Sequence, residues 1–194
     1  MDDTPAAARL LVLTDSTQTP RPLLAQLSVL IDAGVRRIVL REKHSAPDGR
    51  QALAVAVSAL LADAGGELIV ADPSWPVAAA HLSAGHRLPR PRPRVVGRSW
   101  HEGESIDSSV DYVTYSPVFP SASKPGYGPP NGIAGLADAC RRSPVPVFAL
   151  GGADTPRRAA DCRDAGAAGV AVMGAMMRQR RPRSLVGELL DALA

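Results

Sequence analysis

The stretch PVFALGGADTPRRAADCRDAGAAGVAVMG, residues 146–174, decides the fold. It opens with a short apolar run rich in β-forming residues, which predicts a strand, and two glycines follow. A helical pattern then begins with Pro156 in its first turn and ends at Gly166, positions that proline and glycine favour at helix ends. A second apolar run, residues 168–173, completes the unit. A strand, a helix and a second strand in this order predict parallel pairing with a right-handed crossover.

The same alternation runs through the chain. The apolar runs that predict strands are residues 9–14, 36–40, 67–71, 86–88, 94–97, 111–115, 146–150 and 168–173. The helical patterns are residues 20–34, 47–66, 154–166 and 184–194. Eight units in 194 residues leave about 24 residues each, which predicts a small (β/α)₈ TIM barrel. An open doubly wound sheet is the alternative fold.

The interval around the fourth and fifth strands, residues 86–100, is compressed. Its segment PRPRPR, residues 89–94, excludes a helix because proline removes the backbone donor and clashes with the preceding turn. Some helices of the barrel are therefore expected to be short or missing. The whole chain, residues 1–194, is expected to form one domain.

Composition narrows the class of protein. Hydrophobic residues make up 45% of the chain, which favours a globular fold, and no apolar stretch reaches the roughly 18–20 residues of a membrane span. Two cysteines without metal-type spacing favour a cytoplasmic location. The net charge of +3 is concentrated in residues 87–94 and 178–183, so a basic interaction module is one alternative. Neither segment carries interleaved aromatic residues for base stacking, so nucleic-acid binding is not expected.

The residues after the predicted strands are candidates for a site, because barrel enzymes place their active sites at the carboxyl ends of the strands. These residues are Thr14, Arg41, Asp72, Pro89, Ser99, Ser116, Gly151 and Gly174. Gly151 and Gly152 let backbone N–H groups approach an anion at the start of a helix, and Gly174 stands at the matching place after the last strand. The alternative is that these glycines only form tight turns.

The triplet Arg41-Glu42-Lys43 follows the second predicted strand. Successive side chains of a strand point to opposite sides, so the two cations are expected on one side and the carboxylate on the other. Two cations on one side suit a diphosphate leaving group. A surface cluster of salt bridges is the alternative.

The long segment 116–132 contains Ser121, Ser123 and Lys124. It is expected to form a mobile lid whose hydroxyl groups and ammonium close over phosphate oxygens. The alternative is an ordinary surface loop.

Seven motifs together give the chain a family resemblance. They are LTD (13–15), LREK (40–43), VADP (70–73), VVGRSWH (95–101), DYVTYSPVFPSASKPG (111–126), VPVFALGG (145–152) and GVAVMGAM (169–176). In this order and spacing they resemble the thiamin phosphate synthase/TenI superfamily over nearly the whole chain. The resemblance implies a (β/α)₈ barrel that is commonly a homodimer.

The resemblance also implies a reaction. Synthases of this family join hydroxymethylpyrimidine diphosphate to thiazole phosphate and release diphosphate through a dissociative mechanism. Carried over by position, catalytic roles fall on Arg41, Lys43, Ser99 and Lys124. Binding of substrate and phosphate falls on Ser121, Ser123, Gly151, Gly152 and Gly174. Asp72 is the implied Mg²⁺ ligand.

The chain departs from the synthase pattern at several positions. Val39 stands where synthases have glutamine, Ala71 stands where they have asparagine, and no acidic residue lies between Asp72 and Glu102 to serve as a second metal ligand. A TenI-like thiazole tautomerase or a non-catalytic binder of thiazole or thiamin phosphate is therefore the alternative function. The catalytic histidine of that branch is replaced by Pro117, so His101 would be its acid/base, unless it is only a cap or surface residue.

Overall fold

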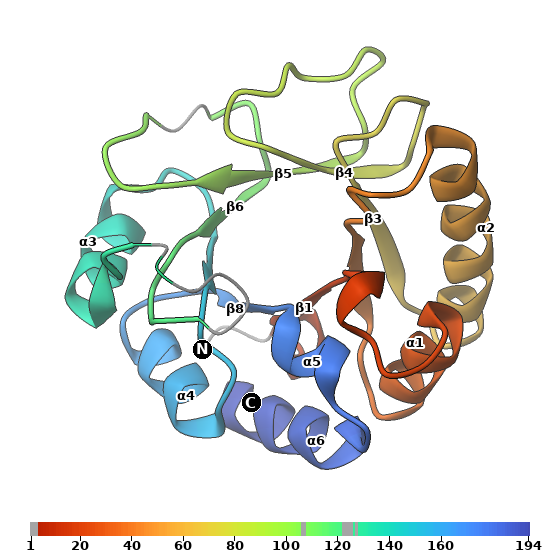
Figure 1. Cartoon of the computed structure of the whole chain (residues 1–194). Coiled ribbons are helices and arrows are strands. Elements are labelled where there is room, and N and C mark those ends of the chain that lie inside the picture. Colours follow the sequence, from red (N-terminus) through yellow and green to blue (C-terminus); the bar gives the residue numbers. More distant parts are fainter. Residues whose placement is uncertain (1–3, 106–107, 122–125, 127) are drawn as a thin grey trace.

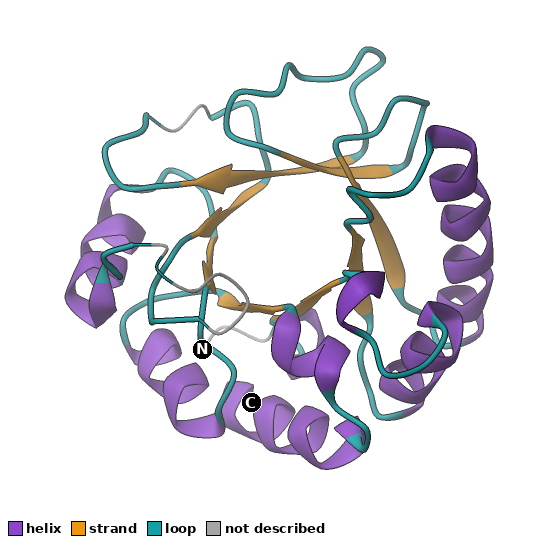
Figure 2. Ribbon diagram, viewed as in Figure 1, coloured by secondary structure: helices purple, strands orange, loops and turns teal. Residues whose placement is uncertain are grey.

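The computed structural model describes residues 4–105, 108–121, 126 and 128–194. Eight parallel strands form a closed barrel in which β1 pairs with both β2 and β8, so the open sheet is excluded (Figures 1 and 2). The strands are β1 Leu10–Leu13, β2 Arg37–Leu40, β3 Glu67–Ala71, β4 Ala79–Leu82, β5 Val95–Trp100, β6 Tyr112–Tyr115, β7 Val147–Leu150 and β8 Gly169–Val172.

The helices cover only part of this barrel. They are α1 Leu23–Asp32, α2 Pro47–Asp63, α3 Gly132–Arg142, α4 Pro156–Asp164, α5 Gly174–Arg178 and α6 Pro182–Leu193, with short 3₁₀ turns η1 Ala6–Ala8 and η2 Ser16–Gln18. Figure 2 shows that loops alone cross the outside of β4 and β5, within the described part of the chain. Trp75, Val77 and Leu88 from these loops pack on the core where helices would otherwise lie. The compression predicted for residues 86–100 is thus confirmed and extends to the connections on both sides.

The prediction of the fourth strand at residues 86–88 is wrong. The strand is Ala79–Leu82, and it pairs with β3 through Ala80 and with β5 through His81. Alanine has low strand propensity, so this segment gave no strong signal, and its burial between two neighbours overrides that propensity. As a result the residue that follows strand four is Ser83, not Pro89.

The strand–helix–strand unit predicted for residues 146–174 is confirmed as β7, α4 and β8. Helix α4 begins at Pro156, and the Thr155 side chain caps it by accepting a hydrogen bond from the N–H of Arg158 at 3.3 Å. After the helix, Gly166 adopts φ +95°, a left-handed conformation that favours glycine.

The two ends of the barrel differ: side chains close the end at the amino ends of the strands, and pockets lie at the carboxyl ends. Its interior is lined by Leu11, Leu13, Val39, Ile69, Ala71, Ala79, Tyr112, Phe148 and Ala171. At the amino ends of the strands, Arg37 pairs with Glu67 at 3.5 Å and lies over the rings of Tyr112 and Phe148. These groups close that end, so the carboxyl ends remain for a site. Among the described residues, no helix combines the length and the apolar character that crossing a membrane requires.

Candidate active site

Two adjoining pockets lie over the carboxyl ends of the strands. The first, called here the glycine pocket, is lined by Ser121, Gly151, Gly152, Asp154 and Gly174, among others. The second, called here the cationic pocket, is lined by Lys43, Arg50, Asp72, His81, Ser83, Ser99 and His101, among others. Both share Leu13, Arg41, Ser116 and Leu150.

The structure gathers eight of the ten site residues predicted from sequence into these two pockets. Ser123 and Lys124 lie outside the described residues, as do the neighbouring lid residues 122, 125 and 127. The eight residues come from the ends of β2, β3, β5, β7 and β8 and from the segment after β6, which agrees with the placement of sites in barrels.

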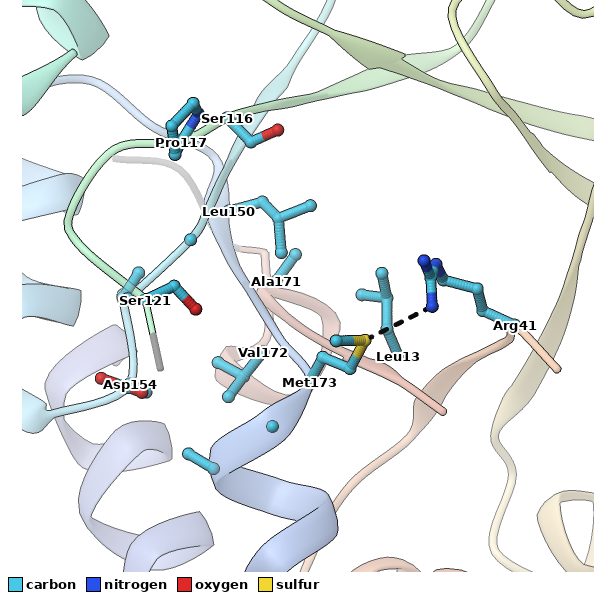
Figure 3. A pocket seen from close by; sticks show the side chains of 15 residues that line it. Leu13, Arg41, Ser116, Pro117, Ser121, Leu150, Asp154, Ala171, Val172 and Met173 are labelled. Atoms are coloured by element: carbon cyan, nitrogen blue, oxygen red, sulfur yellow. Dashed lines mark hydrogen bonds between the residues drawn. The ribbon is translucent and has the colours of Figure 1, made fainter. Parts of the chain in front are cut away.

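The glycine pocket is shaped by a close approach of two loops (Figure 3). Gly152 adopts φ +65°, and a Cβ added there would lie 2.5 Å from the carbonyl oxygen of Pro120 and 2.8 Å from Cβ of Phe119. Both the positive φ and the lack of space therefore disfavour any side chain at position 152. In the part of the chain that the structure describes, the N–H of Gly152 has no hydrogen-bond acceptor, so it is available to an anion.

Arg158 supports this loop from helix α4. Its guanidinium donates a hydrogen bond to the carbonyl oxygen of Gly152 at 2.9 Å and lies 4.8 Å from the ring centroid of Phe119. It also lies 3.6 Å from the carboxylate of Asp154, which lines the pocket. Arg158 thereby offsets a negative charge that would oppose phosphate binding. Sequence analysis missed this residue, although it stands in the first turn of the predicted helix.

Arg41 lies between the two pockets. Its backbone N–H donates to Oγ1 of Thr14 at 2.9 Å, and its guanidinium lies 3.7 Å from Sδ of Met173, which follows β8, two strands away in the barrel (Figure 3). Glu42 is 4% exposed, and both its oxygens accept hydrogen bonds from the backbone N–H of Ser16, at 3.2 and 3.1 Å. The hydrogen bonds of Glu42 come from Ser16, and among the described residues it pairs with neither Arg41 nor Lys43, so these residues do not form the alternative salt-bridge cluster. Glu42 nevertheless lines the same pocket as the two cations, so the expected separation of the carboxylate from them is not complete.

Arg50 adds a cation that sequence analysis did not identify. It stands in the first turns of α2, donates to the carbonyl oxygen of Asp72 at 3.0 Å, and lies 5.3 Å from the ring centroid of Trp75. Its Nε is buried and has no hydrogen-bond partner among the described residues. A buried guanidinium nitrogen without an acceptor is a favourable place for an anionic ligand.

Asp72 occupies an unusual backbone position at the end of β3. It has φ +40°, a left-handed conformation that is uncommon for any residue other than glycine and is often found at functional sites. Its Oδ1 accepts from the N–H of Ser83 at 2.7 Å, and its Oδ2 accepts from Oγ of Ser83 at 2.5 Å. Partial burial pushes the pKa of Asp72 upward, but the hydrogen bonds from Ser83 outweigh it and hold that pKa below its ordinary value.

The residues around Asp72 do not fit the Mg²⁺ ion that the resemblance implies. Mg²⁺ favours carboxylate oxygens, but both oxygens of Asp72 already accept hydrogen bonds from Ser83. Among the described residues, Glu42 is the other carboxylate that lines the cationic pocket, and both its oxygens accept from the N–H of Ser16. The neighbour of Asp72 from the loop after β4 is His86, whose Nδ1 lies 3.4 Å away. The described residues contain no group of three or more histidine, cysteine or acidic side chains that could hold a metal.

His81 forms the floor of the cationic pocket. Its Nδ1 lies 3.1 Å from the hydroxyl of Tyr112, and its Nε2 lies 3.2 Å from Oγ of Ser99 and 3.4 Å from Oγ1 of Thr114. Burial lowers the pKa of His81 to about 4, so the imidazole is neutral near pH 7. Sequence analysis did not place His81 in the site, because the fourth strand was expected at residues 86–88.

His101 stands at the edge of the same pocket. Its Nδ1 lies 3.2 Å from both carboxylate oxygens of Glu104, and its backbone N–H donates to the same carboxylate at 2.8 Å. The ring is therefore oriented by an acidic partner, as an acid/base histidine would be.

The basic segment 87–94 is partly neutralised. Arg92 pairs with Asp111 at 2.9 Å, and Arg94 pairs with Glu67 at 2.6 Å. These ion pairs weaken the alternative of a basic interaction module, because they remove two of the cations it would use.

Comparison of the sequence with known proteins gives a consistent result. The profile of the family described as thiamine monophosphate synthase matches residues 10–176. A thiamine-phosphate synthase of Salinibacter ruber is 32% identical over 206 residues, which cover 95% of this chain and 88% of that protein. A thiamine-phosphate synthase of Anaeromyxobacter dehalogenans is 34% identical over 191 residues, which cover 87% of this chain and 82% of that protein.

Solved structures show the same fold. A thiamine phosphate pyrophosphorylase from Pyrococcus furiosus superimposes with a TM-score of 0.78 at 20% identity, covering 97% of this chain and 96% of that one. At this identity the likeness supports the (β/α)₈ barrel and nothing finer. The sequence match spans most of the chain, from the first strand to the last. The chain therefore belongs to the thiamine monophosphate synthase family.

Proposed function

We propose that this protein is a thiamin phosphate synthase-type transferase, which couples hydroxymethylpyrimidine diphosphate to thiazole phosphate and releases diphosphate. The observation that carries the proposal is the pair of adjoining pockets that share Arg41. A coupling enzyme must hold two phosphorylated substrates side by side. Membership of the family and the names of its relatives support the same chemistry.

The cationic pocket takes the diphosphate. Arg41, Lys43 and Arg50 line it, and their positive charges stabilise the negative charge that develops on the leaving group as the carbon–oxygen bond breaks. Ser99 lines the same pocket and contributes a hydroxyl group. Charge stabilisation in a partly enclosed site is worth more than in water, because fewer solvent dipoles screen it.

The glycine pocket takes the thiazole phosphate. Backbone amides at Gly152 and Gly174 and the hydroxyl of Ser121 bind the phosphate oxygens. The roles of Ser123 and Lys124 remain predictions from the family resemblance, because both lie outside the described residues.

The pyrimidinyl methyl group passes directly from diphosphate to the thiazole nitrogen, and the protein forms no covalent bond with either substrate. The bond between the pyrimidinyl methylene carbon and the diphosphate oxygen breaks, and its electron pair leaves with the oxygen. The thiazole nitrogen then donates its lone pair to the methylene cation and forms the new carbon–nitrogen bond. The protein orients the two substrates and stabilises the departing anion, and no step is assigned to a metal ion.

A TenI-like thiazole tautomerase is the second candidate. The observation that favours it is His101, which lines the cationic pocket and is held by Glu104 in an acid/base arrangement. In that case the protein would move a proton on a thiazole phosphate and would form no thiamin phosphate.

A coupling assay separates the two functions. The protein is incubated with both substrates, and thiamin phosphate is measured by chromatography and mass spectrometry. Arg41→Gln is expected to lower the rate at least about a hundredfold, in the range found when a transition-state charge partner is removed. Arg141→Gln, at a guanidinium with 71% exposure in the last turn of α3, removes the same charge and is expected to leave the rate unchanged.

No thiamin phosphate at high protein concentration, together with proton exchange on thiazole phosphate that His101→Ala abolishes, would establish the tautomerase instead. Proton exchange is followed by NMR in deuterated water. Binding of thiamin phosphate without either reaction would indicate a non-catalytic binder.

Assembly and location are part of the proposal. We expect a homodimer, as the resemblance implies, and light scattering after gel filtration measures it. We expect the protein in the cytoplasm, which agrees with the two cysteines, Cys140 and Cys162, being unpaired.

A further inference from the structure

A chain of hydrogen-bonded side chains runs from the middle of the barrel to the floor of the cationic pocket. The hydroxyl of Tyr112 lies 3.1 Å from Nδ1 of His81, and Nε2 of His81 lies 3.2 Å from Oγ of Ser99. Tyr112 is 3% exposed and His81 is 5% exposed, whereas Ser99 lines the pocket. The order of donors along this chain decides whether Ser99 offers a ligand its proton or its lone pair.

The hydrogen bonds of Tyr112 determine that order. A neutral imidazole has one donor nitrogen and one acceptor nitrogen. If Nδ1 carried the proton, the Tyr112 hydroxyl would need another acceptor, and the described residues form no other hydrogen bond with it. A phenol is also a stronger donor than an aliphatic hydroxyl. Tyr112 therefore donates to Nδ1, and the N–H at Nε2 of His81 donates to Ser99, with Oγ1 of Thr114 as a second acceptor at 3.4 Å.

We propose that Tyr112 and His81 are positioning residues that fix Ser99 as a hydrogen-bond donor toward a diphosphate in the cationic pocket. Oγ of Ser99 accepts from His81, so its own proton is directed away from the ring. Among the described residues Oγ of Ser99 has His81 as its hydrogen-bond partner, and His81 is the donor, so the proton of Ser99 has no acceptor there. A ligand with anionic oxygens provides one. The contact with diphosphate rests on the proposed function, whereas the order of the hydrogen bonds does not.

Gly97 makes room for this chain. A Cβ added at Gly97 on β5 would overlap the ring of Tyr112, so the absence of a side chain there allows the tyrosine to lie beside His81. The two ring centroids are 5.6 Å apart. Phenylalanine at position 112 fits the same space, so Tyr112→Phe removes the hydroxyl group without moving the ring.

NMR spectroscopy of ¹⁵N-labelled protein tests the order directly. Two-bond ¹H–¹⁵N correlations identify the protonated nitrogen of each histidine, and the His81→Gln variant assigns the signals of His81. We expect the Nε2–H form in the unmodified protein and in the matched control Thr114→Val, which removes the other hydroxyl near Nε2. Tyr112→Phe is expected to populate both forms. An Nδ1–H form in the unmodified protein overturns the proposal.

Calorimetry with inorganic pyrophosphate tests the consequence for binding. Ser99→Ala is expected to weaken binding about tenfold, and Tyr112→Phe about threefold, the range of one hydrogen bond. The double variant should bind no more weakly than Ser99→Ala alone, because both changes act through one hydroxyl group. Thr114→Val should bind within about twofold of the unmodified protein.

If the losses of pyrophosphate affinity in Ser99→Ala and Tyr112→Phe multiply in the double variant, the proposal is contradicted, because Tyr112 then acts on binding without Ser99. If the unmodified protein fails to bind pyrophosphate, the proposed diphosphate pocket is wrong, and the tautomer measured by NMR alone decides the order of the hydrogen bonds.

Discussion

Both carboxylate oxygens of Asp72 accept hydrogen bonds from Ser83, one from its backbone N–H at 2.7 Å and one from its hydroxyl at 2.5 Å. This contact joins the end of β3 to the loop after β4, and Arg50 binds the carbonyl oxygen of the same aspartate. Asp72 thus acts as a structural connection across the floor of the cationic pocket. The negative charge of Asp72 is stabilised by these two hydrogen-bond donors of Ser83.

Asp72→Asn is expected to destabilise the fold by about 1 kcal/mol at pH 7, because hydrogen bonds to a charged acceptor are stronger than those to an amide. Asparagine tolerates the left-handed backbone conformation, so strain does not contribute. Urea denaturation at several pH values measures the difference. In the folded protein the pKa of Asp72 lies below its ordinary value of 3.8. The carboxylate's contribution is therefore complete above about pH 4 and lost as the pH falls through the folded pKa.

The control is Asp63→Asn, at the exposed end of α2. This change removes the same charge and is expected to alter stability by less than about 0.5 kcal/mol. An Asp72→Asn variant whose loss of stability stayed constant down to pH 2 would show that the charge of the carboxylate is not what stabilises this connection.

Pyrophosphate binding is expected to depend little on divalent metal. The carboxylate of Asp72 is engaged by Ser83, and its near neighbour is His86. The cationic side chains of the pocket are therefore expected to hold the anion themselves. Calorimetry in the presence of EDTA and then of MgCl₂ should give affinities within about threefold of each other, which is under about 1 kcal/mol. Binding that requires Mg²⁺ would show that the ion displaces Ser83 from the aspartate.

Arg50→Gln is expected to weaken pyrophosphate binding about tenfold, because it removes a charge-assisted donor whose Nε is buried without a partner among the described residues. Calorimetry measures the loss. Arg141→Gln, in the last turn of α3, is the matched control and should change the affinity by less than twofold, because Arg141 does not line the cationic pocket. Equal losses in both variants would mean that only the net charge of the protein matters.

Sequence patterns place residues correctly at the carboxyl rim of the barrel where a strong strand ends in an unusual residue. Arg41 follows a buried run of β-branched and apolar residues, and Gly151 and Gly152 follow another, so both positions could be placed at the barrel rim. The prediction fails where the strand itself is weak. Strand β4 consists of two alanines, His81 and a leucine, and only its pairing with two neighbours defines it.

Contacts between distant segments could not be predicted. Asp72 was singled out as a metal ligand, but its hydrogen bonds to Ser83 depend on how the loop after β4 folds. Arg50 was hidden in a helical pattern, although the first turn of a helix in a barrel always faces the rim that carries the site. A polar or cationic residue in that turn is a signal that sequence analysis can use.

A comparison of Gly152 with Gly65 tests how much close packing contributes at the glycine pocket. Both adopt φ +65°, so alanine at either position introduces the same backbone strain, about 1 kcal/mol. At Gly65 an added Cβ meets nothing within 4 Å, whereas at Gly152 it lies 2.5 Å from the carbonyl oxygen of Pro120. Gly152→Ala is therefore expected to destabilise the protein by at least about 1 kcal/mol more than Gly65→Ala, measured by urea denaturation.

The same pair separates packing from phosphate binding. The new methyl group fits only if Gly152 and the loop that contains Pro120 move apart, and this movement displaces the Gly152 amide. Gly152→Ala is therefore expected to weaken binding of inorganic phosphate, while Gly65→Ala leaves it unchanged. Phosphate binding is measured by calorimetry at a temperature where both variants are folded. Equal stability and equal phosphate affinity in the two variants would mean that the loop after β6 yields to the new methyl group, and that its close approach does not shape the pocket.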